Sequence, residues 1–163
     1  MNPKSILEKN LKNSIKAKQD FLENPPILEE FNDAIEALFE CYSNGGKLYL
    51  AGNGGSAADS QHLAAEFVSK LAFDREALPA EALSVDTSTI TAIANDYGYE
   101  FIFSRQLEAN ASPKDMFLAI TTSGNSDNLI KALEFCKKKK IKSILLSGKE
   151  GGSSKNLADF SII

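Results

Sequence analysis

The chain of 163 residues has the length of one globular domain, with 43% apolar and 25% charged residues. Its 22 acidic residues outnumber 18 basic ones, and this acidic balance argues against direct binding of nucleic acid. No apolar run approaches the roughly 18 residues that cross a membrane, and residues 1–18 lack the charged start and apolar core of a secretion signal. We therefore expect a cytoplasmic protein that binds neither nucleic acid nor membranes.

Two amphipathic helices are predicted at the start of the chain. Apolar residues recur at helical spacing over residues 5–23, and Pro25 and Pro26 end that pattern. A second apolar stripe covers residues 27–42 and ends at an Asn-Gly-Gly signal. The pattern predicts an N-terminal helical hairpin over residues 1–45. Two apolar helices of this kind are more than one domain needs for its own core.

From residue 47 onward, short apolar runs alternate with helical stretches. Strands separated by helices are joined by right-handed crossovers and form a parallel sheet. We predict an α/β domain over residues 46–163, a three-layer α-β-α sandwich with a five-stranded parallel sheet. The predicted strands are 48–51, 82–85, 116–120, 143–146 and 160–163. The predicted helices are 56–72, 87–95, 99–110 and 126–140, with a weak turn at 154–158.

A glycine-rich segment, Gly-Asn-Gly-Gly-Ser at 52–56, follows the first predicted strand and leads into a helix. Ligands of open parallel sheets bind at the carboxyl ends of the strands. Glycines let the backbone approach a ligand, and a helix N-terminus offers N–H donors to a phosphate or carboxylate. Gly52, Gly54 and Ala57 also satisfy a loose dinucleotide pattern, with Asp86 available for a ribose, so a nicotinamide-dependent enzyme is one alternative.

A hydroxyl-rich segment, Thr-Thr-Ser-Gly-Asn-Ser at 121–126, follows the third predicted strand in the same way. Its hydroxyls can donate to a phosphate, although Asn125 or Ser126 could instead serve only to cap the next helix. A P-loop is excluded, because neither Gly-Lys pair is followed by Ser or Thr: Leu48 follows Gly46-Lys47 and Glu150 follows Gly148-Lys149. Hydroxyl-lined loops without that lysine suit a sugar phosphate better than a nucleoside triphosphate.

Two further groups could carry chemistry. His62 and Glu66 are four residues apart, so they share one face of a predicted helix. They could form a surface pair, supply a carboxylate base, or give two ligands to a divalent metal. Asp96 lies in the segment 95–98, which reads as a polar turn or as a simple Asx turn.

In combination and order, the segment 52–56, the pair His62 and Glu66, the segment 95–98 and the segment 121–126 closely resemble the phosphoheptose isomerases of the sugar isomerase (SIS) domain family. The resemblance extends from about residue 11 to residue 163. It implies a flavodoxin-like SIS domain. It also implies the conversion of sedoheptulose 7-phosphate to D-glycero-D-manno-heptose 7-phosphate through an enediol, on the route to the heptose of lipopolysaccharide or capsule.

The resemblance also implies roles for individual residues. Glu66 would be the general base, and His62 a catalytic partner. The implied substrate-binding residues are Asn53, Gly54, Ser56, Asp96, Thr121, Thr122, Ser123 and Ser126. Of these, Asn53 and Asp96 would hold sugar hydroxyls. The three serines and Thr121 would hold the phosphate.

Zinc and self-assembly are further implications of the resemblance. His62 and Glu66 would be ligands of one zinc ion per subunit. The two N-terminal helices would hold a homotetramer with active sites between subunits. The family continues past the fifth strand with a long helix that carries a glutamine and a second histidine, and we expect that helix to be missing from this chain, which stops at Ile163.

A second functional class stays open within the same family. Some members are non-catalytic proteins that bind a sugar phosphate or a replication initiator, and such relatives tend to lack the histidine and glutamate pair. Since both His62 and Glu66 are present here, the sequence favours the isomerase over this alternative.

Overall fold

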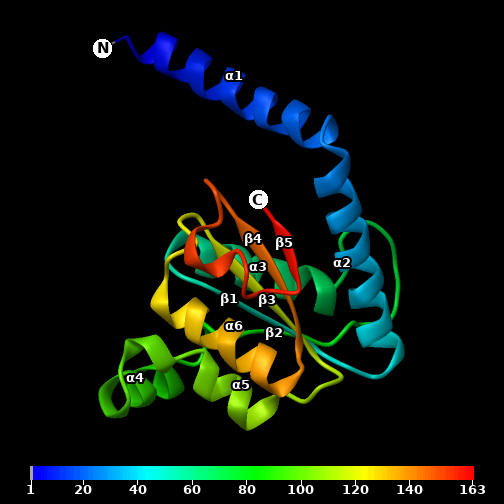
Figure 1. Ribbon diagram of the computed structural model, residues 1–163, viewed down its shortest axis with the longest axis vertical. Coiled ribbons are helices and arrows are strands. Elements are labelled where there is room, and N and C mark those ends of the chain that lie inside the picture. Colours follow the sequence, from blue (N-terminus) through cyan, green and yellow to red (C-terminus); the bar gives the residue numbers. More distant parts are fainter. Residues whose placement is uncertain (1) are drawn as a thin grey trace.

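The computed structural model describes residues 2–163 as two N-terminal helices followed by an α/β body (Figure 1). The helices are α1 (Pro3–Leu22), α2 (Pro25–Ser43), α3 (Gly55–Val68), α4 (Thr87–Asp96), α5 (Ser104–Asn110) and α6 (Asp127–Lys139), with 3-10 turns η1 (Tyr99–Phe101) and η2 (Gly152–Ser154). The strands are β1 (Leu48–Gly52), β2 (Ala80–Ala82), β3 (Met116–Thr121), β4 (Lys142–Ser147) and β5 (Phe160–Ile162). Within residues 2–163, no helix has both the length and the apolar character that crossing a membrane requires.

The five strands form one parallel sheet in the order β2-β1-β3-β4-β5. The predicted α/β class and parallel sheet are therefore confirmed. In this flavodoxin-like order β2 lies on one side of β1, and β3, β4 and β5 follow on the other side, so the order switches between β1 and β3. These two strands pair from Leu48 with Met116 to Gly52 with Ile120. The loops that leave the carboxyl ends of these two strands consequently start side by side.

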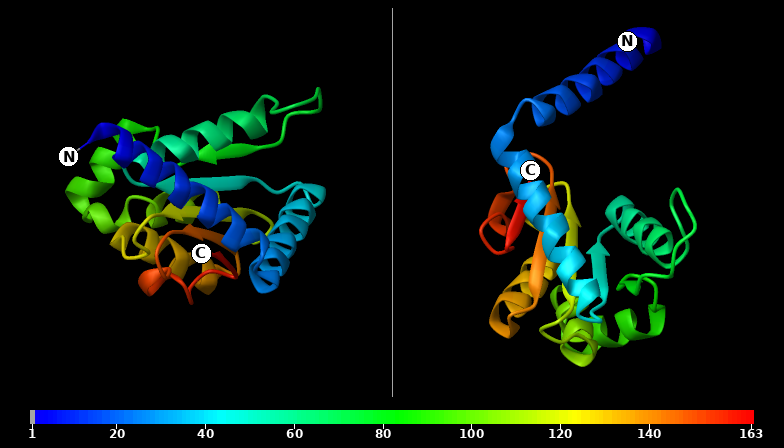
Figure 2. Two further views of the ribbon diagram at one scale, coloured as in Figure 1. Left: turned by 90° about the horizontal axis from the view of Figure 1, so that it is seen from above. Right: turned by 90° about the vertical axis from the view of Figure 1, so that its right-hand side faces the viewer.

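Both faces of the sheet are covered, which produces the three predicted layers (Figure 2). Along β1, Tyr49 and Ala51 contribute to a core shared with α5 and α6, whereas Leu48 and Leu50 contribute to a core shared with α2 and α3. Successive side chains of a strand point to opposite faces. A central strand buried on both sides therefore has the continuous apolar run by which it was predicted.

Three predicted elements differ from the structure. The helix predicted over 99–110 is divided into the turn η1 and the shorter α5. The second strand was expected at 82–85, but β2 ends at Ala82 and Val85 is 56% exposed, because this edge strand has only β1 beside it. The third helix was expected to reach residue 72, but it ends at Val68. Arg75 explains the earlier end: its guanidinium donates to the backbone oxygens of Glu66 and Phe67 at 2.7 and 2.8 Å, which satisfies carbonyls of the last turn.

The N-terminal helices are present, but they do not fold into the hairpin predicted over residues 1–45. α2 packs on the sheet and buries Ala34, Ala37 and Cys41. α1 turns away at Pro25 and extends beyond the body of the fold, with no buried residue among those described (Figures 1 and 2). Its apolar residues, Ile6, Leu7, Leu11, Ile15 and Leu22, are 41–69% exposed.

Candidate active site

The first loop connects β1 to α3 through a turn that only glycine can form. At Gly52 an added Cβ would collide with the backbone oxygen of Ser56. Gly54 has a φ of 56° and a ψ of −120°, a conformation that residues with a side chain rarely adopt. Gly54 has no side chain with which to cap α3. The N–H groups of Ser56, Ala57 and Ala58 donate to the backbone oxygens of Asn53 and Gly54, so among the described hydrogen bonds the Gly55 N–H is the amide of this helix start that is left for an anion.

The second loop is held in shape by its own hydroxyls. The buried Thr121 accepts a hydrogen bond from the Gly124 N–H at 3.2 Å through Oγ1, and Ser123 Oγ accepts one from the Asn125 N–H at 3.2 Å. Ser126 occupies the N-cap position of α6 with extended backbone, but its hydroxyl makes no capping bond within the described chain. The half-buried Ser126 hydroxyl is thus free to meet a ligand, while Thr122, four residues earlier, is exposed.

A turn near the end of the chain braces this second loop. The Gly124 carbonyl accepts hydrogen bonds from the Ser154 N–H at 2.9 Å and the Ser154 hydroxyl at 2.8 Å. Asn125 Oδ1 accepts a third bond, from the Ser153 N–H at 2.9 Å. The sequence predicted only a weak turn in this region, and its bracing role was not foreseen.

Asn53 links the two loops. Its amide forms a reciprocal pair with the amide of Asn128, with N–O distances of 2.9 and 2.8 Å, and its Oδ1 also accepts a bond from the Tyr99 hydroxyl at 3.1 Å. These residues and Ser126 line a hollow of about 320 Å³, together with Glu100 and Asp127. Asn128 is 3% exposed and was missed by the sequence analysis; its signal was a polar residue at a core position of α6.

His62 and Glu66 lie on the other side of α3. The helix buries Ser60 and Ala64, and each member of the pair comes two residues later, about 200° around the helix. His62 Nε2 is 3.7 Å from Glu66 Oε1, with side chains 74% and 29% exposed. Glu66 is also ten residues, or about 15 Å along the axis, from Ser56.

The pair lines a hollow of its own, separate from the one at Asn53. This hollow measures about 380 Å³ and is mostly apolar, with Leu63, Phe67 and Phe73 among its walls. One described chain therefore places the predicted base and the predicted phosphate loops in two different clusters. A single substrate could not reach both without a change in their arrangement or a second copy of the chain.

The two other acidic candidates occupy helix ends. Asp96 is the last residue of α4, is exposed, and accepts a hydrogen bond from the Asn95 side chain at 2.8 Å; it lines a different hollow from Asn53. Asp86 caps the start of α4, where its carboxylate accepts bonds from the side chain and backbone of Thr89, and these bonds lower its pKa. The carboxylate suggested for a ribose is thus engaged in holding a helix.

The described chain offers two residues, His62 and Glu66, for the expected zinc site. Within residues 2–163, no cluster of three or more His, Cys, Asp or Glu side chains could hold a metal ion. His62 and Glu66 are of the right types for zinc, which usually takes four ligands from nitrogen, sulfur and oxygen. These residues fit half of such a site.

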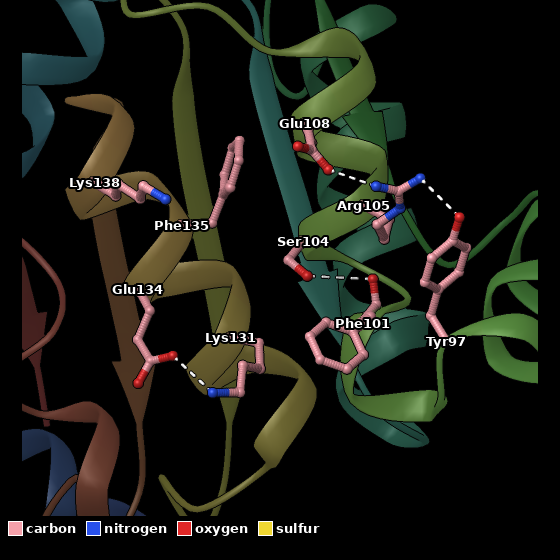
Figure 3. A pocket seen from close by; sticks show the side chains of 9 residues that line it. All are labelled: Tyr97, Phe101, Ser104, Arg105, Glu108, Lys131, Glu134, Phe135 and Lys138. Atoms are coloured by element: carbon pink, nitrogen blue, oxygen red, sulfur yellow. Dashed lines mark hydrogen bonds and ion pairs between the residues drawn. The ribbon is translucent and has the colours of Figure 1, made fainter.

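A groove between α5 and α6 is a further hollow, of about 400 Å³ (Figure 3). Its charged side chains pair with each other: Arg105 with Glu108 at 2.8 Å and Lys131 with Glu134 at 3.0 Å. Arg105 also stacks over the Tyr97 ring, 4.4 Å from its centroid. Since none of the predicted site residues lines this groove, it is not the candidate active site.

Comparison with known proteins identifies the family. A model of the SIS domain matches residues 13–148. The chain is 51% identical over 156 residues to the phosphoheptose isomerase of Aneurinibacillus thermoaerophilus, covering 96% of this chain and 79% of the relative. It is 48% identical over 161 residues to phosphoheptose isomerase 2 of Campylobacter jejuni, covering 99% and 80%. The chain belongs to the phosphoheptose isomerase family.

Solved structures of the family confirm the fold. A phosphoheptose isomerase from Francisella tularensis superposes with a TM-score of 0.91 at 34% identity, over 99% of this chain and 85% of that one. The phosphoheptose isomerase from Neisseria gonorrhoeae gives 0.88 at 36% identity, with the same coverage. The resemblance drawn from the two loops and from His62 and Glu66 is therefore confirmed at the level of family and fold.

Proposed function

We propose that this protein is a phosphoheptose isomerase that converts sedoheptulose 7-phosphate to D-glycero-D-manno-heptose 7-phosphate, for heptose biosynthesis. The observation that carries the proposal is 48–51% identity to phosphoheptose isomerases over nearly the whole chain. The two loops at the β1 and β3 ends add a chemical reason, because amides and hydroxyls gathered there suit a sugar phosphate. The route to lipopolysaccharide or capsule is part of the proposal.

The experiment that tests this function compares phosphorylated and free sugar. The purified full-length protein is expected to form an aldose from sedoheptulose 7-phosphate, and to act on unphosphorylated sedoheptulose at least about 100-fold less efficiently, since binding energy from the remote phosphate assists the reacting end. Nuclear magnetic resonance of the sugar carbons follows both reactions. Equal turnover of both sugars would contradict a phosphate-directed enzyme.

In this proposal the two loops hold the phosphate and Asn53 meets the sugar. Ser56 and Ser126 would donate hydroxyls, with amide donors from the starts of α3 and α6, and Asp96 would hold a sugar hydroxyl. Thr121 and Ser123 would fix the loop by accepting backbone N–H bonds, and each hydroxyl keeps its own hydrogen to donate to the phosphate. The acidic Asp127 in the first turn of α6 leaves α3 the more favourable helix start for an anion.

Replacing Ser126 with alanine is expected to raise KM about tenfold with little change in kcat, because a bond to a charged phosphate contributes about 1.5 kcal/mol or more. The free energy of unfolding should change by less than about 0.5 kcal/mol, since the hydroxyl does not cap α6. Ser88→Ala, at the exposed start of α4, is the matched control. A tenfold loss of kcat at unchanged KM would contradict a phosphate-binding role.

Glu66 is the proposed base, with His62 as its catalytic partner. Conversion of the ketose removes a proton from C1, forms a cis-enediol, and returns a proton to C2 while the two oxygens exchange theirs. One carboxylate over one face of the enediol can take the first proton and give it back at the neighbouring carbon. The apolar walls of the Glu66 hollow would slow the exchange of the carried proton with water without preventing it, since Glu66 is 29% exposed.

The active site is proposed to lie between subunits of a homotetramer. The support is geometric: Glu66 faces away from the sheet and from the phosphate loops of its own chain, so a second copy is the simplest way to join them. The exposed apolar residues of α1 and those of α2 at Phe31, Ile35 and Phe39 offer a surface for assembly.

A charge on α1 is therefore expected to break the assembly. Leu11→Asp places a carboxylate on the apolar stripe, where burial of each leucine would contribute about 2 kcal/mol. Analytical ultracentrifugation should show a smaller species, with turnover lost in proportion. Asn13→Asp, also on exposed α1, should leave both unchanged. If Leu11→Asp keeps the mass of the parent protein, α1 is not the contact.

Zinc is the proposed cofactor, with His62 and Glu66 as two of its ligands and the others from outside the described residues, a second copy or solvent. When bound, zinc would stabilise the negative charge that develops on the enediol oxygens. Elemental analysis should find about one zinc per subunit, and His62→Ala should lose most of it, whereas Gln61→Ala on the same helix should not. Full zinc content in His62→Ala would contradict the assignment.

A further inference from the structure

A buried amide on α6 is tied to the predicted sugar contact. Asn128 is the second residue of α6 and is 3% exposed, yet its side chain turns to Asn53, 75 residues earlier in the chain. A buried polar side chain requires partners, and the reciprocal amide pair supplies them for both ends of Asn128. Asn53 lies in the loop after β1, and Asn128 lies in the first turn of α6, directly after the loop that follows β3. The pair therefore fixes the two loops relative to each other.

The hydrogen bonds at Asn53 leave it one free group. An amide oxygen accepts two bonds, and Asn53 Oδ1 already accepts one from Asn128 at 2.8 Å and one from the Tyr99 hydroxyl at 3.1 Å. The Asn53 NH₂ group has two hydrogens, and one is donated to Asn128 Oδ1 at 2.9 Å. Among the hydrogen bonds of the described residues, its second hydrogen has no acceptor, and Asn53 lines the same hollow as Ser126.

We propose that Asn128 is a positioning residue that locks the Asn53 side chain so that it presents an N–H donor, and not its carbonyl, to an oxygen of the sugar. This inference rests on the proposed isomerase function and deepens it. The locked amide selects a sugar oxygen that can accept a bond, as a hydroxyl or the ketose carbonyl does. It disfavours a group that can only donate, such as the ammonium of an amino sugar at that position.

Kinetics of Asn128→Ala and Asn128→Asp in the full-length protein test the proposal. Both substitutions are expected to raise KM about tenfold with kcat changed less than about threefold. The reason is that an Asn53 side chain no longer held in place binds the substrate and the transition state more weakly by similar amounts. Asn32→Ala is the control, because the Asn32 amide is exposed and donates to Glu36 on its own helix. Thermal unfolding reports separately on any loss of stability.

Two readouts separate positioning from a structural effect. In the Asn53→Ala background, Asn128→Ala should raise KM by less than about twofold, because its effect passes through Asn53. The carboxylate introduced by Asn128→Asp can accept a bond from Asn53 but cannot donate one. Because position 128 is 3% exposed, burial should raise the pKa of the new carboxyl above its usual value of about 3.9. Protonation restores the missing donor, so the KM ratio of Asn128→Asp to wild type should fall as the pH is lowered from about 8 to about 5.

Tyr99→Phe is expected to raise KM only about two- to threefold, since the 56% exposed tyrosine leaves Asn53 Oδ1 open to water as a substitute donor. Independent, multiplicative effects of Asn53→Ala and Asn128→Ala on KM would overturn the proposal, as would an unchanged KM in Asn128→Asp. Wild-type protein that does not turn over sedoheptulose 7-phosphate would instead overturn the proposed function, so the two failures are distinguishable.

Discussion

Replacing Glu66 with glutamine is expected to lower kcat by about 1,000-fold, while KM stays within about threefold of the wild-type value. Glutamine keeps the size of the side chain and its place in the hollow with Phe67. It cannot accept the proton of C1, so the enediol does not form at a useful rate. Steady-state kinetics with sedoheptulose 7-phosphate measure both constants, and the zinc content of the variant shows whether a zinc ligand has been lost as well as the base.

The control for this result is Glu134→Gln. Glu134 is a half-exposed helix glutamate whose carboxylate pairs with Lys131 at 3.0 Å in the groove between α5 and α6. An exposed pair of this kind contributes no more than about 1 kcal/mol, and turnover should not change. If Glu66→Gln retains more than about a tenth of the wild-type kcat, another group is the base and the assignment of Glu66 is wrong.

Gly124→Ala is expected to disrupt the second loop and with it both stability and binding. The φ of Gly124 is 68°, and a Cβ would collide with the carbonyl group of Gly151, in the turn that braces the loop. The left-handed backbone costs about 1–2 kcal/mol and the collision about 1–3 kcal/mol more. We expect a loss of about 3 kcal/mol in the free energy of unfolding, with KM raised more than about tenfold because Ser126 is displaced.

Gly45→Ala separates the two causes. Gly45 has the same φ of 68°, but no atom of the described residues outside its immediate neighbourhood lies within 4 Å of an added Cβ. It should lose only the backbone contribution of about 1–2 kcal/mol and keep the wild-type KM. Equal losses in the two variants, measured by chemical denaturation, would show that the contact with Gly151 is unimportant.

Much of the fold could be predicted because its signals are local and its connections follow one rule. The continuous apolar runs at 48–51 and 116–120 mark strands buried on both faces, and right-handed crossovers make them parallel. Their loops were expected to share one edge of the sheet. The structure confirms this through the direct pairing of β1 with β3.

The relations between elements were harder to predict. The spacing of His62 and Glu66 indicates a shared helix face, but it does not say that this face points away from the phosphate loops, since that depends on which face of α3 packs on the sheet. The hairpin expected from the two N-terminal stripes was wrong for a similar reason. An apolar stripe indicates that a helix will be covered, but Leu11 of α1 remains 55% exposed in the described chain.

Asn128 illustrates a third limit. In sequence it is one polar residue after a helix start, and its partner Asn53 is 75 positions away. Only the adjacency of the β1 and β3 loops brings the amides together, so no local pattern could have identified the pair. Buried polar residues in the loops and first helical turns that follow adjacent parallel strands are therefore a useful place to look for positioning residues.

The most direct test of the proposed chemistry follows sedoheptulose 7-phosphate in deuterated water with the purified full-length protein. The account predicts that D-glycero-D-manno-heptose 7-phosphate forms, that the reverse reaction reaches the same mixture, and that solvent deuterium accumulates at C2 of the aldose as equilibrium is approached, because Glu66 carries the proton through an enediol. Failure to interconvert the two sugars from either side, or equilibration with no deuterium at C2, would contradict it.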